Sequence, residues 1–188
     1  MKKIITLLLM LTITPFAFAS SELVEYAMTL AKAGDAEGQT ALGTMYITGN
    51  GVEQDFQKAK FWLSKAAEQG RADAQHNLGL MYIQGMGAPA DLNKAFNFIE
   101  KAAQGSHAGA QFNLARMYEN GIGVKKDYTQ ANTWWRKAAE QGLAEAQFNL
   151  GVSYETGRGV EQDKKAAFDW YRKAAAQGHE GAKNNLRQ

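Results

Sequence analysis

Apolar residues return along this chain at a fixed spacing of 36 residues. A leucine column and a tyrosine column reveal the period, because every step of 36 lands on the same residue type without an insertion or deletion. These columns are Leu42, Leu78, Leu114 and Leu150, and Tyr46, Tyr82, Tyr118 and Tyr154. A period of this length is typical of stacked repeats, in which neighbouring units cover the apolar face that one unit cannot bury alone. The pattern therefore predicts a repeat array with a continuous core.

Each block of the period reads as two helices joined by a glycine-containing turn. In the second block we expect these helices near residues 74–84 and 91–104, where apolar residues follow helical spacing. A recurring glycine can end the first helix in the left-handed conformation, and a recurring aspartate can cap the second helix. These columns are Gly49, Gly85, Gly121 and Gly157, and Asp55, Asp91, Asp127 and Asp163. The second block departs from the pattern, because Gly105 comes one residue early and Ser106 occupies the usual glycine position.

The two sides of the first helix differ in how much they vary between blocks. At about 100° per residue, Leu42, Met45 and Tyr46 fall on one nearly constant stripe, which we expect to pack on the partner helix. The column of Gly43 holds only glycine or alanine, as close contact between helices requires. The opposite side changes from block to block and is free to bind a partner. We expect the partner-binding residues there: His76, Leu80, Ile83, Phe112, Arg116, Glu119, Phe148, Val152 and Glu155.

Tryptophan and lysine recur in the second helices. The tryptophans share an arc with alanines, which indicates core packing rather than an aromatic ligand box. We expect the lysines to lay their aliphatic stems over the neighbouring repeat, with their ammonium groups in water. The columns are Trp62, Phe98, Trp134 and Trp170, and Lys65, Lys101, Lys137 and Lys173.

Residues 1–19 have the layout of a secretory signal peptide. Lys2 and Lys3 precede an apolar run over residues 4–13, and Ala17-Phe18-Ala19 forms a small-residue cleavage site. The apolar run is shorter than the roughly 20 residues that a membrane-spanning helix needs. We therefore expect cleavage near Ala19, periplasmic or secreted localisation, and no membrane anchor in the mature form.

Charge and cysteine content narrow the classes of partner. The chain has 21 Lys and Arg against 19 Asp and Glu, and loss of Lys2 and Lys3 would leave 19 of each. A nucleic-acid-binding protein needs a net basic face, so we expect no nucleic-acid partner. The chain has no cysteine, so packing between repeats must supply the stability that disulfides give many exported proteins.

Each block has the form Ala-Gln-Phe-Asn-Leu-Gly-x-x-Tyr, Gly-x-Gly-Val, Asp, Ala, Trp, Lys-Ala-Ala, Gln-Gly, which closely resembles Sel1-like repeats. The resemblance implies an all-α, right-handed α-solenoid related to tetratricopeptide repeats, with the first helices on its concave surface. It places four repeats at 35–70, 71–106, 107–142 and 143–178. Residues 20–34 would form an N-terminal capping helix and residues 179–188 a C-terminal cap. It also implies protein–protein binding.

Three functions stay open on the sequence. The first is a periplasmic scaffold or adaptor that binds a protein or peptide in the concave groove. The second is an immunity or inhibitor protein that neutralises a toxic effector enzyme, as some periplasmic relatives do. The third is penicillin binding or hydrolase activity. Penicillin binding is described for cysteine-rich relatives, and the lack of cysteine argues against it.

The residues do not favour an enzyme, a metal site or a cofactor. An enzyme needs a nucleophile with a base, a carboxylate pair or a metal cluster. His76 lies alone on the variable side, and we interpret His107 and His179 as solvated turn residues. No His-x-His or His-x-x-x-His spacing occurs. We interpret Glu119 and Glu155, which align near Arg116, as a mixed-charge binding patch rather than a catalytic pair.

Overall fold

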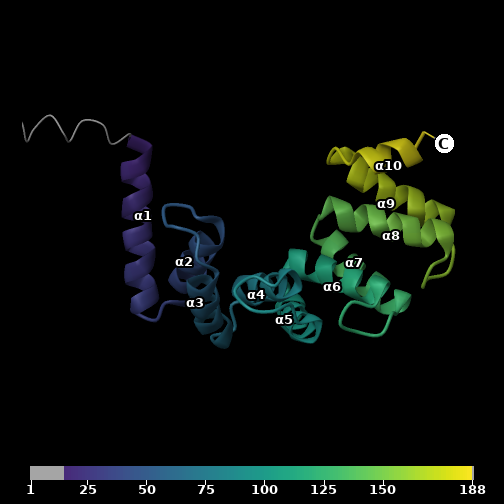
Figure 1. Ribbon diagram of the computed structural model, residues 1–188. Helices are drawn as coiled ribbons and strands as arrows, with labels where there is room; N and C mark the ends of the chain where they lie inside the picture. Colours follow the sequence, from purple (N-terminus) through teal and green to yellow (C-terminus); the bar gives the residue numbers. More distant parts are fainter. Residues whose placement is uncertain (1–14, 188) are drawn as a thin grey trace, which may run out of the picture.

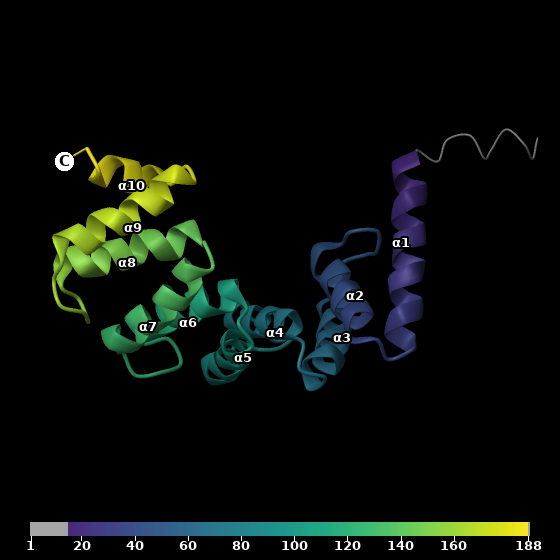
Figure 2. The ribbon, with the colours of Figure 1, turned by 180° about the vertical axis from the view of Figure 1, so that it is seen from behind.

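The computed structural model describes residues 15–187, which form ten helices and no β-strand within that range. Successive helices pack on one another along an arc that is open towards the top of Figures 1 and 2, with α1 at one end and α10 at the other. The helices are α1 (Pro15–Lys32), α2 (Ala36–Thr48), α3 (Phe56–Glu68), α4 (Ala72–Gln84), α5 (Leu92–Gln104), α6 (Ala108–Asn120), α7 (Tyr128–Glu140), α8 (Ala144–Thr156), α9 (Lys164–Ala176) and α10 (Glu180–Asn185). The prediction of an all-helical solenoid is confirmed.

The predicted signal peptide, residues 1–19, lies only partly within the described residues. Most of that segment lies in residues 1–14, outside the described residues. The leading helix α1 begins at Pro15, earlier than the repeat pattern predicts, so the backbone is helical across Ala19.

The ends of the repeat helices follow the predicted chemistry. Gly49 ends α2 with φ 73° and donates its amide to the Met45 carbonyl at 2.8 Å, and the other glycines of its column do the same on α4, α6 and α8. Asp55 caps α3 by accepting from the amides of Gln57 and Lys58 at 3.0 and 2.9 Å. The other aspartates of its column cap α5, α7 and α9 in the same way. Both predicted cap columns are confirmed.

The second repeat keeps its turn geometry with a residue that is poorly suited to it. Ser106 has φ 64° and is the one non-glycine residue with positive φ among residues 15–187. Gly70, Gly142 and Gly178 hold the equivalent positions with φ of 86°, 94° and 93°. A side chain at such a φ costs conformational energy that glycine does not. Packing within the array, rather than the backbone preference of serine, therefore maintains this turn.

The core is a row of fully buried leucines and alanines between paired helices. Leu42, Leu78, Leu114 and Leu150 are at most 1% exposed. The tyrosine column is less buried than its constancy predicts, since Tyr46 is buried but Tyr82, Tyr118 and Tyr154 are half-buried. These three tyrosines lie at the edge of the core, and Tyr118 and Tyr154 each pack against two neighbouring clusters.

The lysines of the recurring column are exposed, and in three of the four repeats the ammonium group lies near an aromatic ring of its own helix. Lys137 and Lys173 place their ammonium groups 4.0 and 3.9 Å from the ring centroids of Trp134 and Trp170, and Lys65 lies 5.7 Å from that of Trp62. Lys137 and Lys173 therefore cover the tryptophan one turn earlier on their own helix, whereas Lys65 lies closer to the Phe61 ring, at 4.8 Å. The reason is geometric, because residues three apart on a helix are neighbours and a cation is attracted to an indole face.

A ladder of glutamines joins the repeats, and the sequence reading did not anticipate it. Gln141 donates from Nε2 to Oε1 of Gln111 at 2.8 Å, and Gln111 in turn donates to the Ala103 carbonyl at 3.2 Å. The same arrangement pairs Gln69 with Gln39 and Gln177 with Gln147. Each pair lies 30 residues apart, so it links a second helix to the first helix of its own repeat. Hydrogen bonding satisfies the buried amides, as low-dielectric surroundings require.

Candidate functional site

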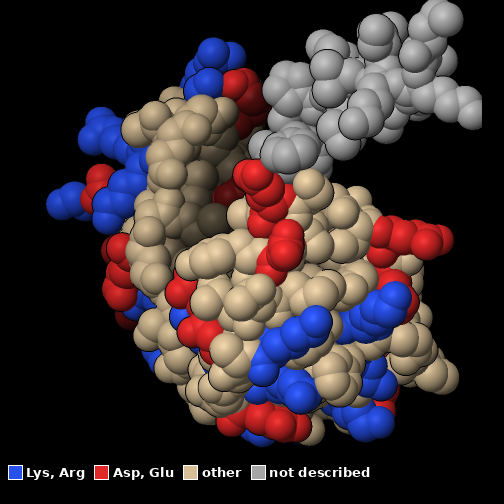
Figure 3. Space-filling model, turned by 90° about the vertical axis from the view of Figure 1, so that its left-hand side faces the viewer, with Lys and Arg blue, Asp and Glu red and all other residues tan. Residues whose placement is uncertain are grey.

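The variable sides of α2, α4, α6 and α8 form one surface, here called the first-helix surface. Side-chain hydrogen bonds connect its neighbouring helices: Asn77 on α4 donates to Thr44 on α2 at 3.2 Å, and Asn113 on α6 lies 2.8 Å from the His76 ring on α4. The space-filling view from the α1 end shows a hollow whose visible wall is mostly uncharged, with acidic side chains beside its opening (Figure 3). These hydrogen bonds join the first helices of the first three repeats to one another.

The predicted partner-binding residues differ in how far they are available to a partner. Arg116 and Glu155 are exposed, while the others are half-buried. The half-buried residues are His76, Leu80, Ile83, Phe112, Glu119, Phe148 and Val152. The structure brings them onto one side of the array, but much of their surface already contacts the protein itself.

The two phenylalanines of this surface also belong to the core. Phe112 packs against the buried cluster of α7 and α8 together with Leu143. The Phe148 ring lies 4.4 Å from that of His179 and 5.7 Å from that of Tyr171. The His179 ring that contacts Phe148 comes from the turn before α10. Replacing either phenylalanine is therefore expected to affect folding as well as any binding.

The charged residues of the surface do not form a single patch. Glu119 pairs at 3.9 Å with Arg158, which lies in the loop between α8 and α9. Glu155 accepts from the Tyr171 hydroxyl at 2.7 Å. Burial, and then this carboxylate, raise the pKa of Tyr171. Arg116 has no ion-pair partner among residues 15–187. The two glutamates thus serve separate contacts, and Arg116 is the free charge of the surface.

The histidines are placed differently from the prediction. His76 is not alone, because its ring centroid lies 4.5 Å from that of His107. His107 and His179 are not solvated turn residues, since each caps a helix by accepting a backbone amide on Nδ1, at 3.0 Å from Ala110 and 3.2 Å from Ala182. Imidazole can act as a cap when it is neutral, because one ring nitrogen then accepts. Their position in the repeat could have indicated this capping role, because the capping residue Asp35 occupies the same position in the first repeat.

An acidic side chain lies beside this pair of histidines. Asp73 places one carboxylate oxygen 3.5 Å from Nε2 of His107 and the other 2.8 Å from the Arg71 guanidinium. Burial, and then the neighbouring His107 ring, lower the pKa of His76 from 6.5 to about 4, against the opposing effect of Asp73. His76 is therefore neutral at physiological pH and can accept from the Asn113 amide.

Acidification is expected to destabilise the fold through His76. The unfolded state takes up a proton near pH 6.5 and the folded state only near pH 4, so stability is complete above pH 6.5 and falls as the pH drops towards 4. Between pH 7 and pH 5 we expect a loss of about 1–2 kcal/mol. His76→Phe, which introduces the residue found in this column in the third and fourth repeats, should flatten the dependence. Urea unfolding at both pH values measures it, and equal pH slopes in the two proteins would contradict this role.

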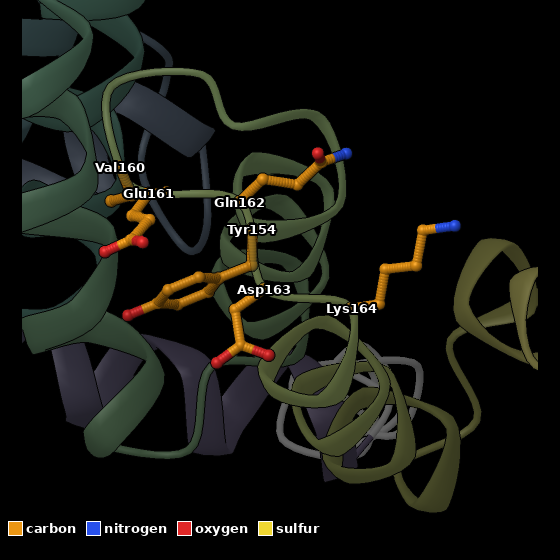
Figure 4. Close-up of a pocket in the computed structure, with 6 residues that line it drawn as sticks. All are labelled: Tyr154, Val160, Glu161, Gln162, Asp163 and Lys164. Atoms are coloured by element: carbon orange, nitrogen blue, oxygen red, sulfur yellow. The ribbon is translucent and has the colours of Figure 1, made fainter.

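A second hollow lies at the loop between α8 and α9. Tyr154, Val160, Glu161, Gln162, Asp163 and Lys164 line it, and the Lys164 side chain points away from the Tyr154 ring (Figure 4). Three of its polar groups already have structural partners: Asp163 caps α9, Gln162 donates to the Glu155 carbonyl at 2.7 Å, and Arg136 donates to the Tyr154 hydroxyl. We interpret this hollow as a consequence of the loop shape.

Metal and membrane features were examined in the described part of the chain. Residues 15–187 contain no group of three or more His, Cys, Asp or Glu side chains that could hold a metal ion. Within the same range no helix has the length and apolar character needed to cross a membrane.

Comparisons with known proteins agree with the repeat architecture. The Sel1 repeat profile matches residues 36–70, 72–107, 108–143 and 144–179. The structure is similar to c5321, a protective antigen of uropathogenic Escherichia coli, with 37% identity, a TM-score of 0.83 and coverage of 89% of this chain and 36% of that one. It is also similar to a Sel1 repeat protein of Oxalobacter formigenes, with 37% identity, a TM-score of 0.85 and coverage of 90% and 49%. This chain thus spans less than half the length of either protein.

A more distant similarity is to the immunity protein Pa5087 of Pseudomonas aeruginosa, with 26% identity, a TM-score of 0.58 and coverage of 91% of this chain and 62% of that one. No curated protein matches the chain. Sel1 repeat proteins generally mediate protein–protein interactions, and their fold is typically a non-catalytic scaffold. With four matched repeats over most of its length, the chain belongs to the Sel1 repeat family.

Proposed function

We propose that the protein is an exported interaction scaffold that binds a protein or peptide on the first-helix surface. The observation that carries this proposal is the contrast between repeats: the packing stripe is constant, while the first-helix surface differs in every unit. Constant positions are explained by the stack, whereas variation on one continuous surface suits recognition of a single, asymmetric partner. The signal-peptide layout of residues 1–19 supports a periplasmic or secreted location.

The third repeat offers the strongest contact point on this surface. Arg116 is exposed and lies one helical turn after the half-buried Phe112, so the two residues share one side of α6. Arginine and aromatic residues dominate the energetics of protein interfaces. A partner that presents an acidic group beside an apolar side chain would complement this pair.

An immunity role is the second candidate. Its support is the similarity to Pa5087, whose name describes an immunity protein. In this version the partner is a toxic enzyme, and the first-helix surface would block or hold it. The chemistry of binding is the same as for a scaffold, but the consequence for the partner differs.

The test is a comparison of two arginine variants. The partner is first captured from cells of the native host by the wild-type protein, identified by mass spectrometry and purified. Calorimetric titration then compares wild type with Arg116→Ala and with Arg172→Ala, which removes an exposed arginine from the second helix α9. We expect Arg116→Ala to weaken binding by about tenfold, as loss of an interface arginine typically does, and Arg172→Ala to leave it unchanged.

The remaining outcomes separate the alternatives. Wild-type affinity in Arg116→Ala, with its melting temperature unchanged, would remove this repeat from the binding surface. If the partner is an enzyme that loses activity on stoichiometric addition of the protein, the immunity role is correct. A partner that keeps its activity in the complex supports the scaffold.

A further inference from the structure

The second repeat departs from the other three where lysine meets tryptophan. In the third and fourth repeats the lysine ammonium lies over the tryptophan one turn earlier, and in the first repeat Lys65 lies 4.8 and 5.7 Å from the ring centroids of Phe61 and Trp62. In the second repeat Phe98 replaces that tryptophan, and its ring stacks on Tyr82, with centroids 5.7 Å apart and planes inclined by 7°. The Lys101 ammonium consequently has no partner among residues 15–187. The lysine ammonium that lies near an aromatic ring in the other repeats is therefore free in the second repeat.

A cavity accompanies this change, here called the Tyr82–Phe98 cavity. It has a volume of about 340 Å³ and is lined by Tyr82, Lys94, Asn97, Phe98 and Lys101. This size is within the range of sites that hold a small ligand or a single large side chain. Its lining combines the two stacked rings with two lysine amines and one side-chain amide. The exposed Asn97 amide, like Lys101, has no hydrogen-bond partner in the described part of the chain.

The charge around the cavity is positive. Lys60 from the first repeat and Lys94 place their ammonium groups 5.5 and 5.6 Å from the centroid of the Tyr82 ring. Lys101 adds a third cation at the cavity wall. Asp91 offsets part of this charge, because it lies 3.1 Å from Lys94. Lys60, Lys94 and Lys101 thus lie beside this ring pair, while the whole chain has a formal net charge of only +2.

We propose that the Tyr82–Phe98 cavity is a docking site for an acidic side chain of the protein partner. The carboxylate would accept from Lys101 and Asn97, and the methylene groups that carry it would pack on the stacked rings. A charge-assisted hydrogen bond is stronger than a neutral one, and the ring faces exclude water from one side of it. This site rests on the proposed protein-binding function, and it adds a contact on the α4–α5 side of the second repeat, apart from Arg116.

The experiment uses a model peptide and a matched lysine variant. The probe is the peptide Ala-Glu-Ala-Glu-Ala, acetylated and amidated, and its control has glutamine in place of both glutamates. Each is titrated into the full-length ¹⁵N-labelled protein and followed by NMR. We expect the glutamate peptide to shift the Asn97 side-chain amide and the backbone signals around Lys101, with binding that weakens as salt is added.

Lys101→Gln and Lys137→Gln provide the comparison, because they occupy the same column and differ in whether the lysine already covers a tryptophan. We expect Lys101→Gln to raise the dissociation constant for the glutamate peptide by about fivefold, and Lys137→Gln to leave it unchanged. Equal binding of the two peptides, or wild-type affinity in Lys101→Gln, would overturn the proposal. Shifts confined to Arg116 and its neighbours would do the same, because they would assign the acidic contact to the first-helix surface.

The identified partner separates this site from the proposed binding surface. If Lys101→Gln weakens capture and Arg116→Ala does not, the cavity stands and the first-helix surface is not the main contact. If Arg116→Ala alone weakens capture, the first-helix surface stands and the cavity is not part of the interface.

Discussion

Replacement of Leu114 by alanine is expected to lower the free energy of unfolding by about 3 kcal/mol. Leu114 is 0% exposed and lies among Ala95, Ile99 and Met117 in the centre of the array. Deleting its side chain removes apolar surface from the core and leaves a cavity that neighbouring helices can fill only in part, because both sides are packed. Urea unfolding monitored by circular dichroism at 222 nm measures the loss.

Leu186→Ala is the matched control, since Leu186 occupies the same column one period after Leu150. It is half-buried at the C-terminal end and packs against one cluster only. Its loss should therefore cost about 1 kcal/mol, in proportion to the smaller area that it buries. Equal losses at the two positions would contradict the view that the column is stabilised from both neighbouring repeats.

The tyrosines explain why damage at Leu114 should spread along the array. Tyr118 packs against both the cluster around Leu114 and the next one, and Tyr154 links the following two clusters in the same way. In a linear array each unit contacts only its neighbours, so such shared residues carry the coupling between units. They are half-buried because they lie between clusters rather than inside one. We therefore expect a single cooperative transition rather than separate melting of the repeats.

The fold could be predicted from the sequence because the period of 36 residues shows each position of the repeat four times. Positions that must meet a backbone requirement, such as Gly49 and Asp55, kept their identity in all four, and the structure shows the left-handed cap and the aspartate cap there. Contacts between different columns were harder to predict, because the period does not say which columns meet. His76 meets His107 at a separation of 31 residues and Gln39 meets Gln69 at 30, and neither distance follows from the period.

The candidate site was harder to predict for the same physical reason. Angular position on α6 and α8 placed Phe112 and Phe148 on the free side, and that side does vary. Phe148 packs on the rings of Tyr171 and His179, and Phe112 packs on a cluster that includes residues of α7 and α8. A helical wheel contains no information about the neighbouring repeat, so it cannot separate a partner-facing side chain from one that packs on the next unit. Arg116 escapes this ambiguity because no residue in the described range pairs with its charge.

Gly79→Ala is expected to destabilise the fold although alanine is the better helix former. Gly79 lies in the middle of α4, where a β-carbon would come within 2.4 Å of Cγ1 of Ile99 and 3.3 Å of the Ala95 carbonyl oxygen. The helical preference for alanine contributes about 0.5–1 kcal/mol in favour of the variant. Overpacking of a fully buried isoleucine costs about 1–3 kcal/mol, so the clash should prevail. Urea unfolding of the single variant gives the sign.

The cause of this loss can be isolated by removing the side chain that the new methyl group meets. In an Ile99→Ala background the space opposite residue 79 is open, so Gly79→Ala should change sign and stabilise by about 0.5–1 kcal/mol through helix propensity alone. The third repeat shows that the column accepts a methyl group when the facing residue is different, because Ala115 lies opposite Trp135 in the same cluster. Ile99→Ala is itself destabilising, and a stabilising osmolyte in both arms keeps the folded baseline measurable. If Gly79→Ala costs the same in both backgrounds, the small column is not set by the facing side chain, and close approach of the backbones of α4 and α5 must be its reason.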